Sequence, residues 1–184
     1  SYKADGIWQK GEDIANSAQP NCKPDDIKLV DIKSDKTINQ QDRTIVGDPN
    51  PKYNLGFSNT FRYKNFDMSI FFDAVVDFDV FKYWFVDTEL GNGTTNCTKD
   101  TYFKAYTDSN PSTSTPRLGS GIDPNASSFR VADGTFLRCK NLSIGYSFDP
   151  DLLKNSIQKL RLFFNVENLF VLTNYNGYDP EGSL

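Results

Sequence analysis

Residues 53–80 read YNLGFSNTFRYKNFDMSIFFDAVVDFDV, and apolar side chains recur at every second position along nearly all of them. One face carries Tyr53, Leu55, Phe57, Phe61, Tyr63, Phe66, Met68, Ile70, Phe72, Ala74, Val76, Phe78 and Val80. The other face carries Asn54, Gly56, Ser58, Thr60, Arg62, Asp67, Ser69, Asp73, Asp77 and Asp79. Alternation over this length predicts β-strands with one apolar and one polar face.

The dipeptide Lys64-Asn65 interrupts the alternation and predicts a two-residue turn that joins two strands into a hairpin, residues 53–80. We expect Asn65 to adopt the positive φ that such a turn needs, because asparagine tolerates that conformation. Pairing across the turn places Tyr63 opposite Phe66 and sets apolar residues opposite each other along the apolar face. Asn59 is the one polar residue on that face.

Two further amphipathic strands are predicted within residues 136–172. Apolar residues alternate in residues 136–148 and in residues 160–172, with Asn168 as an exception. The apolar phase of the first of these strands lies on Leu142, Ile144, Tyr146 and Phe148, but upstream it lies on Leu137 and Cys139. This change of phase predicts a β-bulge near Lys140-Asn141, or burial of both faces there.

Composition narrows the possible functions. The chain has 184 residues, 15 Phe, 9 Tyr and one Met, a balance that favours strands over helices. A net charge of -4 argues against a nucleic-acid partner. The lack of histidine removes His-based catalytic triads and His metal sites. No CxxC motif is present, and a disulfide between Cys22 and Cys97 is left open.

The run Asp31–Asp42 has the outline of a calcium-binding EF-hand loop. Asp31, Asp35 and Asp42 fall at ligand positions of such a loop. However, Lys33 replaces an oxygen ligand and Lys36 replaces the turn glycine. We therefore predict a structured loop that holds no metal.

Two architectures bury one face of long amphipathic strands: a soluble β-sandwich and an outer-membrane β-barrel. The predicted strands reach the roughly 9–11 residues that a membrane-spanning strand needs. Short connections at residues 64–65 and 149–159 alternate with long ones at residues 1–52 and 81–127, as periplasmic turns alternate with extracellular loops in barrels. We therefore predict an all-β fold of antiparallel strands from a large transmembrane outer-membrane barrel. A soluble β-sandwich carbohydrate-binding module is the alternative.

Four strands cannot close a barrel, because known barrels begin at about 8 strands. An open sheet in lipid would leave backbone groups unpaired. The chain is therefore expected to be part of a larger barrel.

Four motifs point to a family. They are Asp42–Lys52 (DRTIVGDPNPK), Tyr63–Phe72 (YKNFDMSIFF), Arg130–Tyr146 (RVADGTFLRCKNLSIGY) and Glu167–Glu181 (ENLFVLTNYNGYDPE). In order and spacing they resemble the C-terminal barrel region of the SusC/RagA family of TonB-linked outer-membrane transporters. The resemblance covers residues 1–181, with Asn65 where the family often has glycine and Cys139 where leucine is common.

The resemblance implies a nutrient importer in the bacterial outer membrane. Members form a barrel around a plug domain, work with a SusD-like surface lipoprotein and take energy from TonB. Oligosaccharides or peptides are the implied substrates, and the sequence does not choose between them. The resemblance also implies that the plug, the TonB-contacting segment and the final strand lie outside this chain. No enzyme activity and no cofactor are expected.

Candidate functional residues fall into two groups. Charged residues expected to face the lumen are Asp67, Asp73, Asp77, Asp79, Arg161 and Glu167. They line a substrate path, or else form ordinary polar packing between wall and plug. Aromatic residues of loop 81–127 expected to contact a sugar or the lid partner are Tyr83, Trp84, Tyr102 and Tyr106; packing within the loop is the alternative. Asp77 and Asp79 have the residue types of a glycosidase acid pair, but their context does not support that chemistry, and no catalytic residue is predicted.

Overall fold

The computed structural model describes residues 1–83, 89, 96–119, 127–149, 157 and 159–183. The chain forms two compact units. The sheet unit comprises Pro49–Val80 and Asp133–Leu184, and the loop unit comprises Ser1–Asp48 and Phe81–Ala132.

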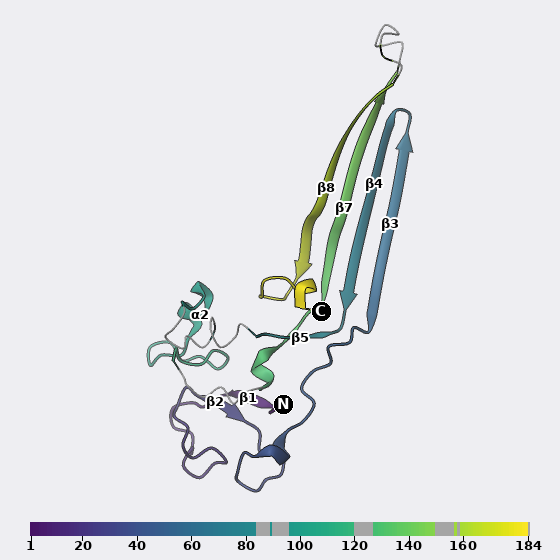
Figure 1. Cartoon of the computed structure of the whole chain (residues 1–184). Coiled ribbons are helices and arrows are strands. Elements are labelled where there is room, and N and C mark those ends of the chain that lie inside the picture. The colour runs from purple at the N-terminus through teal and green to yellow at the C-terminus, as the bar shows by residue number, and fades with distance from the viewer. Residues whose placement is uncertain (84–88, 90–95, 120–126, 150–156, 158, 184) are drawn as a thin grey trace. The chain divides into compact units, whose positions relative to one another are not determined.

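The sheet unit is built on four long antiparallel strands, which lie side by side in Figure 1. They are β3 (Tyr53–Tyr63), β4 (Phe66–Val76), β7 (Phe136–Phe148) and β8 (Leu160–Thr173), in the spatial order β3-β4-β7-β8. Their lengths of 11, 11, 13 and 14 residues equal or exceed what a membrane-spanning strand requires. The predicted all-β, antiparallel fold class is confirmed.

The strand register is the predicted one. Tyr63 pairs with Phe66, and Asn59 pairs with Ile70. The register of β4 with β7 and of β7 with β8 continues each row across the sheet. One row of the apolar face joins Phe57, Phe72, Cys139 and Phe170, and the next joins Asn59, Ile70, Leu142 and Val166. Asn59 thus lies on the apolar face, which is otherwise built from apolar side chains.

The hairpin turn differs from the prediction in one residue. Lys64, not Asn65, has the positive φ, at 52°. One class of two-residue hairpin turn has a positive φ at its first central residue and not at its second. The prediction therefore assigned the positive φ to the wrong residue of the pair.

The predicted bulge is confirmed. Between the pairs Cys139–Phe170 and Asn141–Glu167, β7 passes one residue and β8 passes two, so the register shifts there. Asn168 lies in this interval with a φ of 51°. The break in the apolar pattern at Asn168 therefore marks an irregular backbone, which a bulge explains.

Strand β4 ends earlier than predicted. It stops at Val76, and Asp77 has a φ of 61°. Phe78 is buried and meets Phe136 edge-on, with ring centroids 6.4 Å apart, and Val80 is also buried. The prediction that Phe78 and Val80 continue the apolar face to residue 80 was wrong, because the chain leaves the ladder at Asp77.

Strand β5 (Asp79–Phe81) follows the turn at Asp77. It pairs with β6 (Val131–Asp133), which comes just before β7, in a two-stranded sheet.

The loop unit has a small core of its own. Strands β1 (Ala4–Ile7) and β2 (Ile27–Leu29) pair, and Ile27 and Leu29 pack against Tyr2, Ala4, Ile38 and Phe129. Short helical segments are η1 (Gln40–Asp42), α2 (Lys99–Lys104) and η2 (Ser128–Arg130) here and η4 (Glu181–Ser183) in the sheet unit. All three cysteines have free thiols, so the Cys22–Cys97 disulfide is not formed. None of the described helices combines the length and apolar character needed to cross a membrane.

Replacing Gly134 with alanine should destabilise the sheet unit. A Cβ at this position would lie 2.5 Å from the ring of Phe78 and 2.6 Å from Val80, both buried. Overpacking of this kind costs about 1–3 kcal/mol. Gly56→Ala is the matched control, since its Cβ would meet the nearest atom at 3.6 Å. Urea unfolding midpoints of the complete receptor should fall for Gly134→Ala alone; equal midpoints for both variants would contradict the packing described here.

Candidate functional site

The polar face of the sheet carries a network of five charged side chains. Lys140 on β7 lies 3.0 Å from Asp73 on β4 and 2.8 Å from Glu181 in the C-terminal segment. Arg138 on β7 contacts Asp179 at 2.6 Å and Glu181 at 3.1 Å. The Arg138 side chain is 8% exposed, so its charge needs these partners.

The C-terminal segment is held against the sheet by hydrogen bonds as well as by ion pairs. The hydroxyl of Thr173 donates to the carbonyl of Thr135 at 2.7 Å, and the Tyr175 N–H donates to the same hydroxyl oxygen at 3.0 Å. The Glu181 N–H then donates to the Asp179 carboxylate at 2.9 Å. Residues 173–181 therefore place two carboxylates over two cations of the polar face.

A second ion pair joins Arg161 on β8 to Asp67 on β4. Its two hydrogen bonds, from Nη2 and Nε, measure 2.7 and 3.2 Å and form a bidentate contact. Gly145 on β7 lies between the two strands, and a Cβ there would collide with both side chains. The absence of a side chain at Gly145 thus lets the pair reach across β7.

The charged residues that were predicted to face the lumen separate into two groups. Asp67, Asp73, Arg161 and Glu167 lie on the polar face, where Glu167 pairs with Asn141 in the ladder. Asp77 and Asp79 do not lie on β4 as predicted. Asp77 is an exposed turn residue whose carboxylate pairs with Lys52, and Asp79 begins β5. Their proposed alternation along one strand was wrong, because that strand ends at Val76.

The predicted loop aromatics also differ from one another. Tyr83 is 82% exposed and lies edge-on to Phe81, and Tyr102 is 63% exposed on α2. Tyr106 is only 7% exposed and forms part of the walls of two cavities, which agrees with the alternative of packing within the loop. Trp84 lies outside the described residues.

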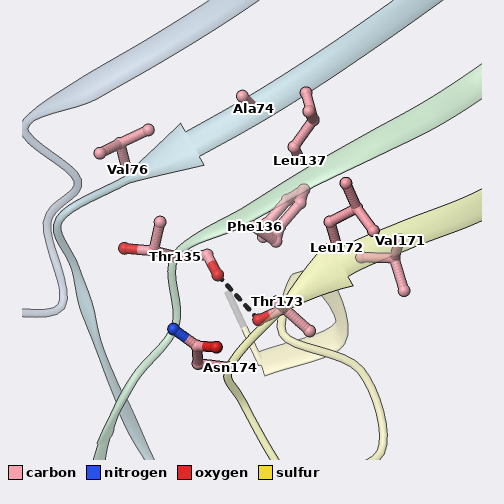
Figure 2. A pocket seen from close by; sticks show the side chains of 9 residues that line it. All are labelled: Ala74, Val76, Thr135, Phe136, Leu137, Val171, Leu172, Thr173 and Asn174. Atoms are coloured by element: carbon pink, nitrogen blue, oxygen red, sulfur yellow. Dashed lines mark hydrogen bonds between the residues drawn. The ribbon is translucent and has the colours of Figure 1, made fainter.

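A cavity of about 620 Å³ lies at the end of the long strands (Figure 2). Its lining includes Ala74, Leu137 and Leu172 of the apolar face, and also Thr135 and Thr173, which are joined by a hydrogen bond. The lining residues contain no charged side chain. The cavity wall combines apolar side chains with the polar groups of Thr135, Thr173 and Asn174.

The Asp31–Asp42 loop keeps the shape of a cation loop. The carboxylates of Asp31, Asp35 and Asp42 lie within 4.8 Å of one another, and Lys36 has a φ of 61° at the position usually held by glycine. Their oxygens are engaged by the loop itself: the Ser34 and Lys36 N–H groups donate to Asp31 at 2.6 and 2.8 Å.

Asp42, the last acidic residue of this loop, is fully buried. Backbone N–H groups of Asn39, Lys33 and Ile32 donate to its carboxylate, at 2.9, 3.1 and 3.0 Å. These bonds, led by the one from Asn39, hold the pKa of Asp42 below its usual value although burial acts the other way. The carboxylate thus organises the loop, and the absence of metal stays a prediction.

Long strands with one apolar face and one charged, ion-paired face are typical of the wall of an outer-membrane β-barrel. Two solved RagAB structures share this fold. The chain matches a structure of the RagAB peptide transporter with a TM-score of 0.73 and 24% identity, over 98% of this chain and 19% of that one. It also matches the RagAB peptide importer in the 'closed-closed' state with a TM-score of 0.67 and 24% identity, over 98% and 20% of the two chains.

Two curated proteins with similar sequences are TonB-dependent receptors. TonB-dependent receptor P3 of Formosa agariphila is 36% identical over 99% of this chain and 18% of its own length. TonB-dependent receptor SusC of Bacteroides thetaiotaomicron is 32% identical over 88% of this chain and 16% of its own. No profile of a known protein family matches. These relatives confirm the resemblance to the SusC/RagA family of TonB-linked receptors; the chain spans less than a fifth of their length.

Sequence reasoning missed the cluster of Arg138, Lys140, Asp179 and Glu181. A signal was present: Arg138 and Lys140, two positions apart, are the two charged residues of β7. A cation in a barrel wall requires an anionic partner. The partners lie 41 residues away in the chain, where no local pattern could identify them.

Replacing Glu181 with glutamine should loosen the C-terminal segment. The change removes a charge that pairs with both Arg138 and Lys140. Because Glu181 is partly exposed, the expected loss is about 1 kcal/mol in the free energy of local opening. Hydrogen exchange of the Tyr175 and Glu181 amides in the complete receptor measures it. Glu167→Gln, on the same polar face, is the control, and equal protection of these amides in both variants would contradict the network's role.

Proposed function

We propose that this chain forms the wall and an external loop region of a TonB-dependent importer in the bacterial outer membrane. The supporting observation is the match to TonB-dependent receptors along nearly the whole chain, together with a sheet whose two faces suit two different media. The rest of the barrel, its plug and the TonB-contacting segment would come from the remainder of the receptor.

Lipid is the medium that fits the apolar face. Large apolar side chains there are exposed, among them Leu55, Phe57, Phe61, Leu162, Phe164 and Leu172. A continuous apolar surface of this kind is unstable in water and stable against hydrocarbon chains. Tyr63, Phe66, Tyr146 and Phe148 gather near the Lys64-Asn65 turn and fit an aromatic girdle at the periplasmic interface.

The polar face fits the barrel lumen. Its charges are largely paired with one another, as in Arg161–Asp67 and Lys140–Asp73, which suits packing against a plug better than attraction of a charged substrate. Loops 1–52 and 81–127 would then be extracellular and contact a SusD-like lid lipoprotein. One solved structure with the same fold is that of the RagAB peptide importer. We propose that the nutrients imported here are oligosaccharides or peptides.

Two other functions fit less well. A soluble carbohydrate-binding sandwich needs a second sheet against the apolar face, yet the side chains of that face are exposed. Catalysis by Asp77 and Asp79 would need a supported acid pair, and Asp77 is an exposed turn residue paired with Lys52. We therefore propose no enzyme activity.

Arginine at position 57 should block insertion of the receptor into the outer membrane. Phe57 lies on the apolar face, where arginine at mid-membrane costs about 2–4 kcal/mol. Ser58, the next residue, lies on the polar face, so Ser58→Arg is the matched control. Immunoblots of outer-membrane fractions should show a large loss of Phe57→Arg and normal levels of Ser58→Arg. The opposite result would show that the faces are assigned the wrong way round.

Replacing residues 96–119 with a short Gly-Ser linker should abolish co-purification of the lid lipoprotein. These residues belong to loop 81–127 and carry the exposed aromatic rings of Tyr102 and Phe103, of the type that anchors interfaces. Affinity purification of the tagged receptor from detergent-solubilised outer membranes measures the partner. The variant's presence in that membrane controls for folding, and undiminished recovery of the lipoprotein would refute the contact.

A further inference from the structure

Asn59 places a carboxamide in the middle of the apolar face. It pairs with Ile70, and the register continues this row through Leu142 and Val166, which are also apolar. The two neighbouring rows carry Phe57, Phe72, Cys139 and Phe170 on one side and Phe61, Met68, Ile144 and Phe164 on the other. Rows on one face are about 6.6 Å apart, since each residue of a strand rises about 3.3 Å. With lipid against this face, polar headgroups beyond these rows are out of reach of the Asn59 side chain.

The carboxamide of Asn59 has no hydrogen-bond partner in the part of the chain that the structure describes. Such a group offers two N–H donors and one carbonyl acceptor. In hydrocarbon these atoms lose the hydrogen bonds that water gives them in the unfolded chain, and the loss is costly in free energy. An aliphatic residue in the same place would avoid this cost. A hydrogen-bonding partner outside the described sheet would remove it while keeping the asparagine.

The open edge of β3 is the place where such a partner fits. In the order β3-β4-β7-β8, β3 pairs with β4 on one side and has no strand on the other among the described residues. The strands of outer-membrane barrels are antiparallel, and directly opposite side chains of antiparallel strands have Cβ atoms about 4.5–5.5 Å apart. A polar side chain opposite Asn59 on the next strand would therefore lie within hydrogen-bonding reach.

The open edge of β3 is regular enough to accept a neighbour along its full length. All 11 residues of β3 pair with β4 without a register shift, from Tyr53 opposite Val76 to Tyr63 opposite Phe66. The strand contains no proline and no residue with positive φ, and its one charged residue, Arg62, lies on the polar face. Strand edges that stay unpaired are usually interrupted by bulges, prolines or charges. Since β3 has no bulge and no proline, its edge presents a continuous row of backbone donors and acceptors.

We propose that Asn59 hydrogen-bonds a serine, threonine, asparagine or glutamine side chain on the neighbouring strand of the receptor, and that this pair fixes the register between that strand and β3. The proposal rests on the import function above, which supplies the surrounding lipid and the rest of the barrel. The partner is a strand of the same receptor, and its hydrogen-bonding residue lies directly opposite Asn59 on the lipid-facing side.

The pair fixes the register because the apolar residues around Asn59 do not distinguish one alignment from the next. A slip of two residues keeps every side chain on its own face and again sets apolar groups opposite Phe57 and Phe61. The same slip moves the polar partner one row away from Asn59 and leaves both groups unpaired in hydrocarbon. Single polar residues in otherwise apolar contacts specify register in this way in coiled coils.

Hydrogen exchange of the β3 amides, measured by mass spectrometry on the complete receptor in lipid nanodiscs, tests the pair. Asn59→Thr and Asn59→Val are the informative variants, because the two new side chains have similar shapes and differ by a hydroxyl in place of a methyl group. Threonine keeps a group that hydrogen-bonds across strands, whereas valine leaves the partner unpaired. We expect Asn59→Val to lower the protection of the β3 amides about tenfold relative to Asn59→Thr. Ile70→Leu, an apolar change in the same row, is the control and should exchange like the unaltered receptor.

Equal protection in the two variants, or higher protection with valine, overturns the proposal and is the result expected if Asn59 faces lipid alone. For a variant that does not insert, immunoblots of outer-membrane fractions give the same comparison. A loss with valine that accompanies dissociation of a receptor dimer, seen by mass photometry, also overturns it, because the partner is then a second copy. These outcomes leave the import function standing. Absence of the unaltered receptor from the outer membrane would refute that function itself.

Discussion

Pairing of backbone groups is the constraint on which the sheet depends. A strand in hydrocarbon has no water to satisfy its N–H and C=O groups, so every strand needs a neighbour on both sides. In the order β3-β4-β7-β8, the inner strands β4 and β7 meet this condition. The outer strands β3 and β8 each have one edge without a partner strand among the described residues. Closure of the ladder therefore requires further strands of the receptor beside β3 and β8.

The same constraint explains the charges on the polar face. A wall that is apolar outside can carry ions only on the inside, and each ion held away from bulk water needs a counter-ion. Arg161 meets this need within the sheet through Asp67, at the position where Gly145 leaves room. Arg138 meets it with Asp179 and Glu181, which lie beyond the last strand of the sheet. The C-terminal segment is thus coupled to the wall by charge as well as by chain connection.

The sheet was predictable because its information is local. A period of two specifies which face each side chain takes, and a turn of two residues then specifies the register, so that Tyr63–Phe66 and Asn59–Ile70 follow from the sequence alone. The end of β4 was not predictable, because Phe78 and Val80 continue the alternation while the backbone turns at Asp77. The Arg138–Asp179 and Arg161–Asp67 pairs join residues distant in sequence, and no periodicity reports such contacts.

The sheet unit and the loop unit are stabilised by different interactions. Most wall positions have to match lipid, a neighbouring strand or a counter-ion, so we expect a substitution there to affect membrane insertion first. The loop unit has its own small core around Ile27 and Leu29, and its cavity side chains, such as Asp25 and Tyr102, lie outside that core. Side chains at the cavities can therefore change while the core of the loop unit and the wall keep their structure, the usual division between a scaffold and its variable loops.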